Sequence, residues 1–384
     1  MGTNVSRRKS IAIAVLLALA LAFSATGPAA SAAEAPDVEI SGNPIVGAVL
    51  IVDGAQEYFE GCGGYGDPGY SIQWLRDGEP IAPDPRYSPY LHVVELDDLG
   101  GRISALASGS PAACSGRKVV TQETAVVEKE PLRAAGFTGR GVFELLGRTH
   151  DGTLMLYLGK DTSKGWKESR RVGPGWGLFT RIIAGGDLTH DGIADLMVEN
   201  TSGTLYRFPG TGDGGFHTDN AKGTWEWSAM DNAIGPGDWN GDGLNDLLAS
   251  DSTGDLFVFP SQPFGGWGAR EKVGQGWDVM DLLIGPGDWD GDGNVDVLAK
   301  DKTGRLYFYG GDGHGGWTTA RQIGQGWNAL TMIGSAGDFN RDGFNDVHGV
   351  NAAGDLVMYY GDGRGGWKGV ETVGWGWNIF NGLY

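Results

Sequence analysis

Acidic side chains recur at a fixed spacing in four nine-residue loops of this chain. The loops run over Asp187–Asp195, Asp238–Asp246, Asp288–Asp296 and Asp338–Asp346, and each is named below by its first residue. Oxygen donors at positions 1, 3 and 5 lie on one side of a tight turn, and a glycine at position 6 allows that turn. An aspartate at position 9 closes the set, so these oxygens can converge on a hard cation.

Calcium is the predicted ion, because it takes six to eight oxygen ligands, whereas magnesium dehydrates reluctantly and zinc prefers cysteine and histidine. The alternative is four acidic surface turns without an ion. The Asp187 loop has Thr189 at position 3, which lacks a charge, so we expect it to bind most weakly. The predicted ligands are Asp187, Asp191, Asp195, Asp238, Asn240, Asp242, Asp246, Asp288, Asp290, Asp292, Asp296, Asp338, Asn340, Asp342 and Asp346.

A fifth copy of the loop, Gly136–Glu144, departs from the pattern. It keeps Gly141 at position 6, but position 1 is Gly136 and position 5 is Arg140. A cation then stands where a ligand should be, so we predict no calcium in this copy and at most four ions per chain. Arg140 is expected to pair with Glu144 in place of the ion.

The five copies are about fifty residues apart, and such a period is typical of propellers and solenoids. Each repeat contains short apolar and aromatic runs between glycine-rich turns, which read as four strands. No sustained helical period occurs. Four strands per unit, repeated radially, predict an all-β fold: a five-bladed β-propeller over residues 130–384.

The two ends of this region stand at the same phase of the repeat. Tyr384 is equivalent to Gly334 one repeat earlier, and the first repeat begins near Pro131. We therefore expect the last strand to complete the first blade and close the ring, which would remove exposed strand edges. The alternatives are an open fragment of a larger ring and a dimer that shares blades.

The acidic loops resemble the FG-GAP or VCBS repeats of integrin α-subunit propellers and of secreted bacterial proteins. The resemblance covers roughly Pro131–Tyr384. It implies that the loops between two strands of a blade bind calcium. Five blades are fewer than the seven usual in integrins, and the ring size is similar to that of tachylectin-type lectins.

Residues 1–33 have the pattern of a secretion signal. Basic residues 7–9 precede a short apolar run, Ile11–Phe23, which is followed by small residues near Ala32. The run is too short to span a bilayer. The twin-arginine pattern is incomplete, so the general secretory route is favoured, and the mature protein is expected to be extracellular and not inserted in a membrane.

Residues 34–129 lack the repeat and contain alternating stretches that read as strands. The segment from Gln73 to Ile81 resembles bacterial Ig-like β-sandwich modules, in which the tryptophan equivalent to Trp74 fills the core. Cys62 and Cys114 both lie here. In a secreted domain two cysteines suggest a disulfide, and two free thiols are the alternative.

The net charge of −19, from 48 acidic and 29 basic residues, disfavours binding to nucleic acid or to anionic membranes. The clustered loop carboxylates should repel one another without an ion. The six histidines fall at unrelated phases of the repeat, and no nucleophile motif accompanies them. We therefore expect a non-enzymatic, monomeric protein that loses stability in a chelator.

A recurring tryptophan is the candidate ligand contact. It follows a glycine-rich turn, which suggests one open ring face that could stack on a sugar, and repeated sites would gain through multivalency. The alternative is that these rings are core between blades. Carbohydrate is the leading ligand class; a protein-binding cell-surface scaffold is the second hypothesis, and an accessory module of a secreted hydrolase is less favoured. The series is Trp176, Trp227, Trp277, Trp327 and Trp377.

Overall fold

The computed structural model describes residues 38–63, 68–110, 114–128, 136–218, 222–227, 229–263 and 266–384. The predicted all-β class is confirmed: the described residues form many small sheets, and their one α-helix, α1 (Ala55–Tyr58), has four residues. No helix in this described part has the length and apolar character needed to cross a bilayer. The predicted secretion signal and the predicted boundary at residues 129 and 130 lie outside the described residues.

Five four-stranded antiparallel sheets, sheets 1 to 5, make up the repeat region. Sheet 1 contains β29 (Phe380–Leu383), β8 (Glu144–Thr149), β9 (Leu154–Gly159) and β10 (Trp166–Gly173). Sheet 2 contains β11 (Phe179–Gly186), β12 (Asp195–Asn200), β13 (Thr204–Phe208) and β14 (Lys222–Glu226). Sheet 3 contains β15 (Met230–Gly237), β16 (Asp246–Asp251), β17 (Asp255–Phe259) and β20 (Glu271–Gln275). Sheet 4 contains β21 (Met280–Gly287), β22 (Asp296–Asp301), β23 (Leu306–Gly311) and β24 (Trp317–Gly324). Sheet 5 contains β25 (Leu330–Gly337), β26 (Asp346–Asn351), β27 (Leu356–Gly361) and β28 (Trp367–Gly374). A two-stranded ribbon joins β18 (Ser261–Gln262) to β19 (Gly266–Trp267).

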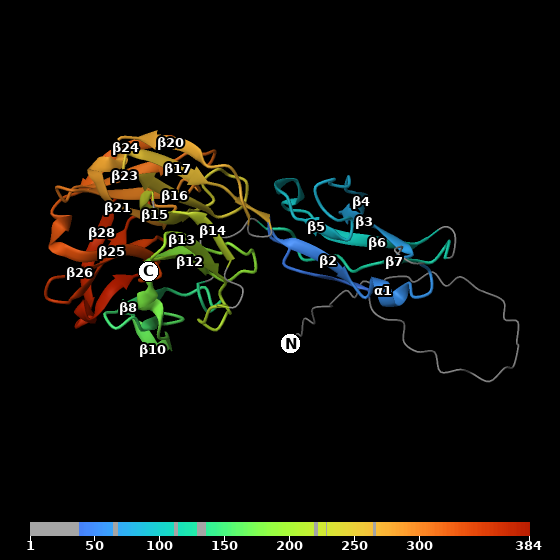
Figure 1. The fold of residues 1–384 in the computed structure, drawn as a ribbon, viewed down its shortest axis with the longest axis horizontal. Coiled ribbons are helices and arrows are strands. Elements are labelled where there is room, and N and C mark those ends of the chain that lie inside the picture. Colours follow the sequence, from blue (N-terminus) through green and yellow to red (C-terminus); the bar gives the residue numbers. More distant parts are fainter. Residues whose placement is uncertain are drawn as a thin grey trace, which may run out of the picture. The chain divides into compact units, whose positions relative to one another are not determined.

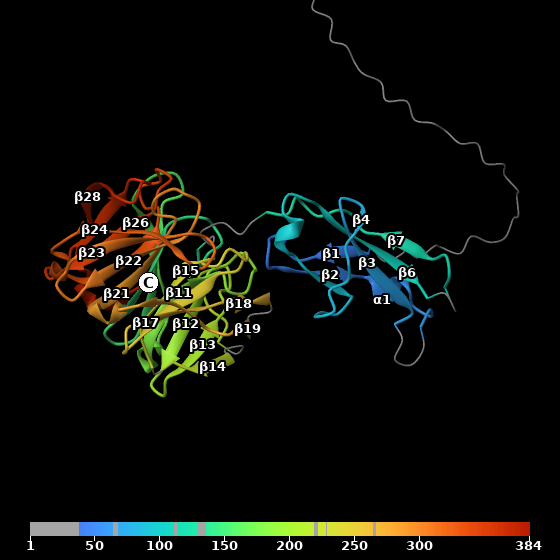
Figure 2. The same cartoon turned by 90° about the horizontal axis from the view of Figure 1, so that it is seen from above.

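The five sheets surround a common axis in a propeller-like arrangement (Figures 1 and 2). Their first-listed strands lie nearest that axis, where β11, β15, β21, β25 and β29 contact one another in succession. The second strands carry continuous apolar runs, such as Leu247 to Ala249, which are fully buried. A short apolar run of this kind suits a strand that is covered on both faces.

The terminal strand completes sheet 1, as predicted. β29 pairs antiparallel with β8, in a register that sets Phe380 opposite Thr149 and Leu383 opposite Gly147. Tyr384 extends the pairing, because its N–H and C=O both hydrogen-bond to Leu146 at 2.9 Å. Two strands more than two hundred residues apart in sequence thus hold the first and last parts of the repeat region together.

A one-turn 3₁₀ helix precedes the innermost strand in four of the sheets. Each begins at a tryptophan of the recurring series, and the glycine before it has a positive φ between 76° and 96°. Glycine adopts this left-handed conformation without the penalty that a Cβ atom brings. The turns are η2 (Trp176–Leu178), η4 (Trp277–Val279), η5 (Trp327–Ala329) and η6 (Trp377–Ile379).

The N-terminal described residues form two further antiparallel sheets over one core. The first contains β1 (Glu39–Ser41), β2 (Val49–Asp53) and β5 (Leu91–Val93); the second contains β4 (Glu79–Pro80), β3 (Tyr70–Arg76), β6 (Ile103–Gly109) and β7 (Lys118–Val120); η1 (Leu96–Asp98) follows β5. Trp74 is buried between them with Leu50 and Ile103, as a core residue. Cys62 and Cys114 form a disulfide beside this core.

Candidate metal centres

The acidic loops all connect the innermost strand of a sheet to its second strand, so they gather at one end of the sheets. In sheet 4, β21 ends at Gly287 and β22 begins at Asp296, with the Asp288 loop between them. Positions 4 and 6 of every loop have positive φ. Glycine supplies position 4 in two loops, whereas His190 and Arg341 adopt φ of 61° and 63° there. The backbone therefore turns in the same way whichever residue stands at position 4.

The position 1 aspartate is held by the amides of its own loop. In the Asp288 loop, Oδ1 accepts from the N–H of Gly291 at 2.7 Å and Oδ2 from that of Gly293 at 3.0 Å. The Asp238 loop repeats both bonds at the same lengths. Several N–H donors aimed at one carboxylate fix its orientation before any ion binds. Sequence spacing alone could not establish this.

The position 9 aspartate is the most deeply buried member of each set. Asp296 is fully buried; its Oδ2 accepts from the N–H of Trp289 at 2.7 Å, and its Oδ1 accepts from that of Gly311 at 3.0 Å. Burial raises the pKa of Asp195, Asp296 and Asp346 to about 7. Burial, followed by the charge of Asp242, raises the pKa of Asp246 to about 8. A nearby cation would favour the charged form of such a carboxyl group.

The Asp288 loop brings three carboxylates to one point. Ligand oxygens of Asp288, Asp290 and Asp296 all lie within 4.8 Å of one another, the one such group of three that the described residues contain. Two oxygens that each sit ~2.4 Å from a calcium ion can be no more than ~4.8 Å apart. The donor set therefore fits calcium in chemistry and in size. Asp292, at position 5, is outside this group, and its Oδ1 accepts from the N–H of Asn294 at 2.8 Å.

The other three loops bring fewer free carboxylates together. Asn240 donates to Asp242 Oδ2 at 3.1 Å in the Asp238 loop. In the Asp338 loop the ammonium of Lys368 lies 2.9 Å from Asp342 Oδ2 and competes for a ligand oxygen. The Thr189 hydroxyl lies 3.4 Å from Asp187 Oδ1. These contacts rank the Asp288 loop first among the candidate centres.

The Gly136 loop has the same backbone turn as the acidic loops, but a different side chain occupies the space inside the turn. Gly139 and Gly141 have positive φ, as positions 4 and 6 do elsewhere. A Cβ on Gly136 would lie 2.8 Å from Glu144 Oε2, so the glutamate side chain occupies the space of the position 1 side chain. The predicted pair between Arg140 and Glu144 is wrong: Arg140 pairs with Asp161, and Glu144 accepts from the N–H and hydroxyl of Thr138. A longer carboxylate that bonds its own loop needs no cation partner.

Each loop also packs against the following sheet through its position 2 side chain, a contact that was not predicted from the sequence. Trp239 packs on Trp317 with ring centres 4.5 Å apart, and its C=O accepts from the N–H of Gly315 at 3.1 Å. Trp289 and Trp367 repeat the ring contact in the next pair of sheets. The available signal was the bulky apolar residue at position 2 of all five copies: Phe137, Leu188, Trp239, Trp289 and Phe339.

The prediction that the tryptophan series offers open ring faces to a ligand is wrong. Trp277 packs on Tyr309 at 4.7 Å and Trp327 on Tyr359 at 4.6 Å, each inside the core between sheets. A Cβ on Gly324 would lie 2.2 Å from the indole Nε1 of Trp327. The glycines therefore make room for the buried rings instead of exposing them. Trp176, Trp227, Trp277, Trp327 and Trp377 are only 3–7% exposed.

Four exposed large apolar side chains lie at the opposite ends of the innermost strands, around the 3₁₀ turns. Trp375 is 77% exposed and directly precedes Gly376 and η6. Leu178, Val279 and Ile379 end their turns at equivalent positions and are 72%, 51% and 53% exposed. The sequence signal for Trp375 was a second tryptophan in a turn where the equivalent residues are Pro174, Gln275 and Gln325.

Residues 288–349 match the family model described as FG-GAP-like repeat. This stretch begins with the Asp288 loop and ends within β26, so it includes the best-formed candidate centre. No curated protein matches the chain.

Several solved structures are similar to the chain. One is an Agrocybe aegerita lectin that recognises non-reducing terminal N-acetylglucosamine, with 16% identity, a TM-score of 0.36, and coverage of 90% of this chain and 92% of that chain. Another is the BP39L lectin from Burkholderia pseudomallei, with 13% identity, a TM-score of 0.37, and coverage of 72% and 78%. A mutant of AofleA from Arthrobotrys oligospora has 13% identity, a TM-score of 0.34, and coverage of 71% and 80%.

Proposed function

We propose that the chain is a secreted, calcium-stabilised, five-bladed β-propeller that acts as a non-enzymatic binding protein, carried behind an Ig-like β-sandwich. The convergence of Asp288, Asp290 and Asp296 within 4.8 Å supports the calcium site most directly. The FG-GAP-like match over the same loop agrees with it. Secretion rests on the pattern of residues 1–33 and on the disulfide, which suits an oxidising compartment.

The role of calcium in this proposal is structural. The ion supplies positive charge at the point where loop carboxylates meet. Asp288 and Asp290 would bind it from the loop surface, and Asp296 from the buried side. Position 2 residues such as Trp289 tie each loop to the next sheet, so an ordered loop also holds neighbouring sheets together.

Calcium titration calorimetry with metal analysis tests this part of the proposal. We expect up to four ions in the calcium-equilibrated protein and one ion fewer in Asp290→Ala, because that change removes one of the three converging carboxylates. Asp231→Ala, which removes an exposed acid outside the loops, serves as the matched control and should keep the wild-type stoichiometry. Absence of bound calcium in the wild type would overturn the metal assignment.

Carbohydrate remains the first ligand class to test, with an exposed tryptophan as the candidate contact in place of the buried tryptophan series. Trp375 is the most exposed large apolar side chain among the described residues, and a free indole face can stack on a sugar ring. The equivalent turns carry Gln275 and Gln325, whose amides could hydrogen-bond sugar hydroxyls. A glycan array in calcium and in EDTA, run with wild type and Trp375→Ala, checks this. Binding that the variant loses supports a lectin.

A protein partner is the second candidate. Leu178, Val279 and Ile379 place exposed aliphatic groups at equivalent turns around the same end of the sheets, and the burial of the tryptophan series removes the repeated sugar contact. Exposed apolar side chains grouped on one surface favour a protein interface. If the array shows no glycan, a pull-down with wild type and a Leu178→Ser, Val279→Ser, Ile379→Ser variant becomes the deciding measurement. The absence of any catalytic constellation in the sequence argues against an enzyme.

A further inference from the structure

The Asp238 loop contains an asparagine that is directly followed by a glycine, at Asn240 and Gly241. Glycine has no side chain to hinder its backbone nitrogen, so this nitrogen can attack the side-chain amide of the preceding asparagine. The other three acidic loops have Thr-His, Asp-Gly and Asn-Arg at the same two positions. Among the acidic loops, this one therefore combines a reactive amide with an unhindered neighbouring nitrogen.

Packing against sheet 4 requires glycine at position 241. Gly241 has a φ of 80°, and a Cβ on it would lie 2.1 Å from the C=O oxygen of Gly313, in the turn between β23 and β24. His190 and Arg341 show that the left-handed conformation alone admits a side chain at position 4. The close approach of the Gly313 backbone is what excludes one here. The tertiary structure therefore keeps an unhindered nitrogen next to Asn240.

In the closed loop, both groups that would react are held by other hydrogen bonds. Asn240 Oδ1 accepts from the N–H of Asp242 at 2.8 Å, and Asn240 Nδ2 donates to Asp242 Oδ2 at 3.1 Å. The N–H of Gly241 donates to Asp238 Oδ1 at 2.7 Å. The Gly241 nitrogen must lose this bond before it can attack, so the loop must open first. The two aspartates therefore protect Asn240 while the loop is closed.

Calcium would keep the Asp238 loop closed, because Asp238 and Asp242 are among the predicted ligands of the ion. This step rests on the proposed function. A ligand that binds only the closed loop lowers the open population by about 100-fold when its free concentration is ~100 times Kd. Without the ion, repulsion between the carboxylates favours opening. The exposure of Asn240 to reaction is thus linked to loss of calcium.

We propose that Asn240 is a modification site, which deamidates through Gly241 when the Asp238 loop holds no ion. The Gly241 nitrogen forms a bond to Cγ of Asn240, the bond from Cγ to Nδ2 breaks, and the amide group leaves with the Gly241 proton as ammonia. Water then opens the cyclic imide. Hydrolysis of the new bond from Cγ gives aspartate, and hydrolysis at the main-chain carbonyl carbon gives isoaspartate.

The two products would change the loop in different ways. Aspartate would give the Asp238 loop acids at positions 1, 3, 5 and 9, which is the set that the Asp288 loop has. Calcium affinity depends on the number of charged ligands, so this product favours binding. Isoaspartate adds a methylene group to the main chain and would move the turn at Gly241 away from its contact with Gly313.

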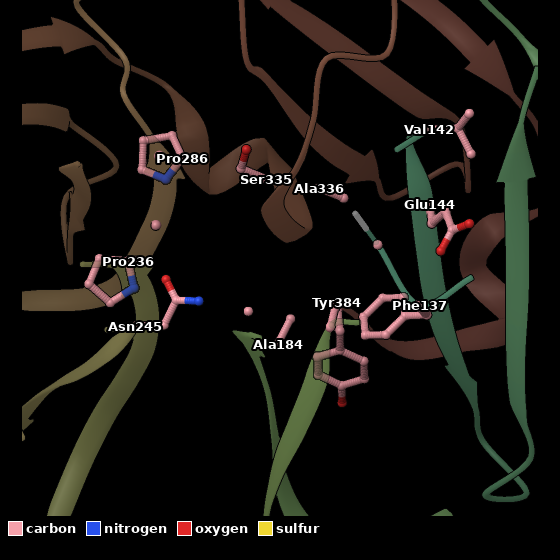
Figure 3. Close-up of a pocket in the computed structure, with 17 residues that line it drawn as sticks. Phe137, Val142, Glu144, Ala184, Pro236, Asn245, Pro286, Ser335, Ala336 and Tyr384 are labelled. Carbon is pink, nitrogen blue, oxygen red and sulfur yellow. The ribbon is translucent and has the colours of Figure 1, made fainter. Parts of the chain in front are cut away.

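Asn245, at position 8 of the same loop, is the first internal control. Figure 3 shows it beside Pro236 in the pocket that Pro286 also lines. Its Nδ2 donates to the C=O of Asp187 at 2.9 Å, and the residue that follows it is Asp246. Opening of the loop would affect both asparagines, but the next residue is glycine only at Asn240.

Two asparagines elsewhere in the chain separate the remaining conditions. Asn340 occupies position 3 of another acidic loop, where the side chain of Arg341 hinders the nitrogen that would attack. Asn381 precedes Gly382, but this pair belongs to β29, and the register sets Gly382 opposite Arg148. One control therefore has the loop without the glycine, and the other has the glycine without the loop.

Peptide mapping by mass spectrometry tests the proposal on protein kept at pH 8, below its Tm, in millimolar calcium or in EDTA. We expect Asn240 to deamidate at least ~10-fold faster in EDTA than in calcium, because the ion suppresses opening. In EDTA, Asn240 should also react faster than Asn245 and Asn340. The rate at Asn381 should not depend on calcium.

Two results would overturn the proposal. One is a rate at Asn240 in EDTA that is no higher than the rate at Asn340. The other is an equal rate at Asn240 in calcium and in EDTA, in protein that calorimetry shows to bind calcium. Calorimetry reports on the ion, whereas the comparison of asparagines in EDTA needs none, so the proposed function and this inference can fail separately.

Discussion

The indole rings of Trp289 and Trp367 lie with their centres 5.0 Å apart at an interplanar angle of 64°, and this contact joins the Asp288 loop of sheet 4 to the outer strand of sheet 5. Trp289 is 1% exposed. The Nε1 of Trp367 also donates a hydrogen bond to the C=O of Ile323 at 2.9 Å, and Ile323 belongs to β24 of sheet 4. One aromatic pair therefore links a candidate metal loop to the packing between two sheets.

Trp289→Ala should lower the free energy of unfolding by about 3–5 kcal/mol, as expected for removing a buried tryptophan. It should also weaken calcium binding at the Asp288 loop, because the loop loses its anchor to sheet 5. Trp289→Phe should cost less, since Phe339 fills the same position in the next loop. Chemical denaturation and calcium calorimetry on both variants measure these effects. Similar stabilities for the alanine variant and wild type would contradict the anchoring role.

Gly324→Ala should destabilise the protein by about 1–3 kcal/mol, the usual cost of overpacking a core. The added Cβ would lie 2.2 Å from Nε1 of Trp327. Gly173 stands at the same phase of the repeat in sheet 1, but a Cβ there would meet nothing within 4 Å. Gly173→Ala is thus the matched control and should be neutral or slightly stabilising. Denaturant titrations that rank the two variants in the reverse order would refute the account of these glycines.

The calcium-free protein should become less stable as pH rises from about 4 to about 8. Burial raises the pKa of Asp195, Asp296 and Asp346 to about 7, and that of Asp246 to about 8, whereas an unfolded aspartate titrates near ~3.9. Between these values the folded state keeps protons that the unfolded state has released, so stability falls with pH and levels off above the folded pKa.

Calcium should oppose this loss, because it competes with protons for the same carboxylates. The difference in Tm between calcium and EDTA is therefore expected to be larger at pH 8 than at pH 5. Thermal unfolding in both conditions across this range checks the sign. A Tm in EDTA that rises steadily from pH 5 to pH 8 would show that these carboxyl groups do not control the pH dependence.

Lys368→Ala should strengthen calcium binding at the Asp338 loop by up to about fivefold, because an exposed ion pair is worth at most ~1 kcal/mol. In the wild type the Lys368 ammonium lies 2.9 Å from Asp342 Oδ2 and must release it before that oxygen can bind an ion. Lys272→Ala is the control, since Lys272 pairs with Asp255, outside the loops. Calorimetric titration of both variants makes the comparison. Weaker binding in Lys368→Ala would mean that the lysine supports the loop.

The repeat alone was enough to predict the class of fold and the pairing of the last strand with the first blade, here sheet 1. These features follow from local chemistry repeated in phase: short apolar runs, glycines at turns, and acids at fixed offsets. In the Asp288 loop the position 3 residue, Asp290, is one of the three carboxylates whose oxygens lie within 4.8 Å of one another, whereas the other loops have Thr189, Asn240 or Asn340 at position 3.

Which side chains are covered was decided by the tertiary structure. A repeat identifies Trp277 and Trp327 as equivalent, but the rings that bury them belong to Tyr309 and Tyr359, which the following sheet supplies. The partner of Arg140 was likewise misjudged, because Asp161 is twenty-one residues away in sequence and adjacent in space. The sequence by itself determined the repeating backbone, whereas the contacts between one sheet and the next determined which side chains are core and which are exposed. Burial depends on atoms distant in the chain, and a local pattern does not record them.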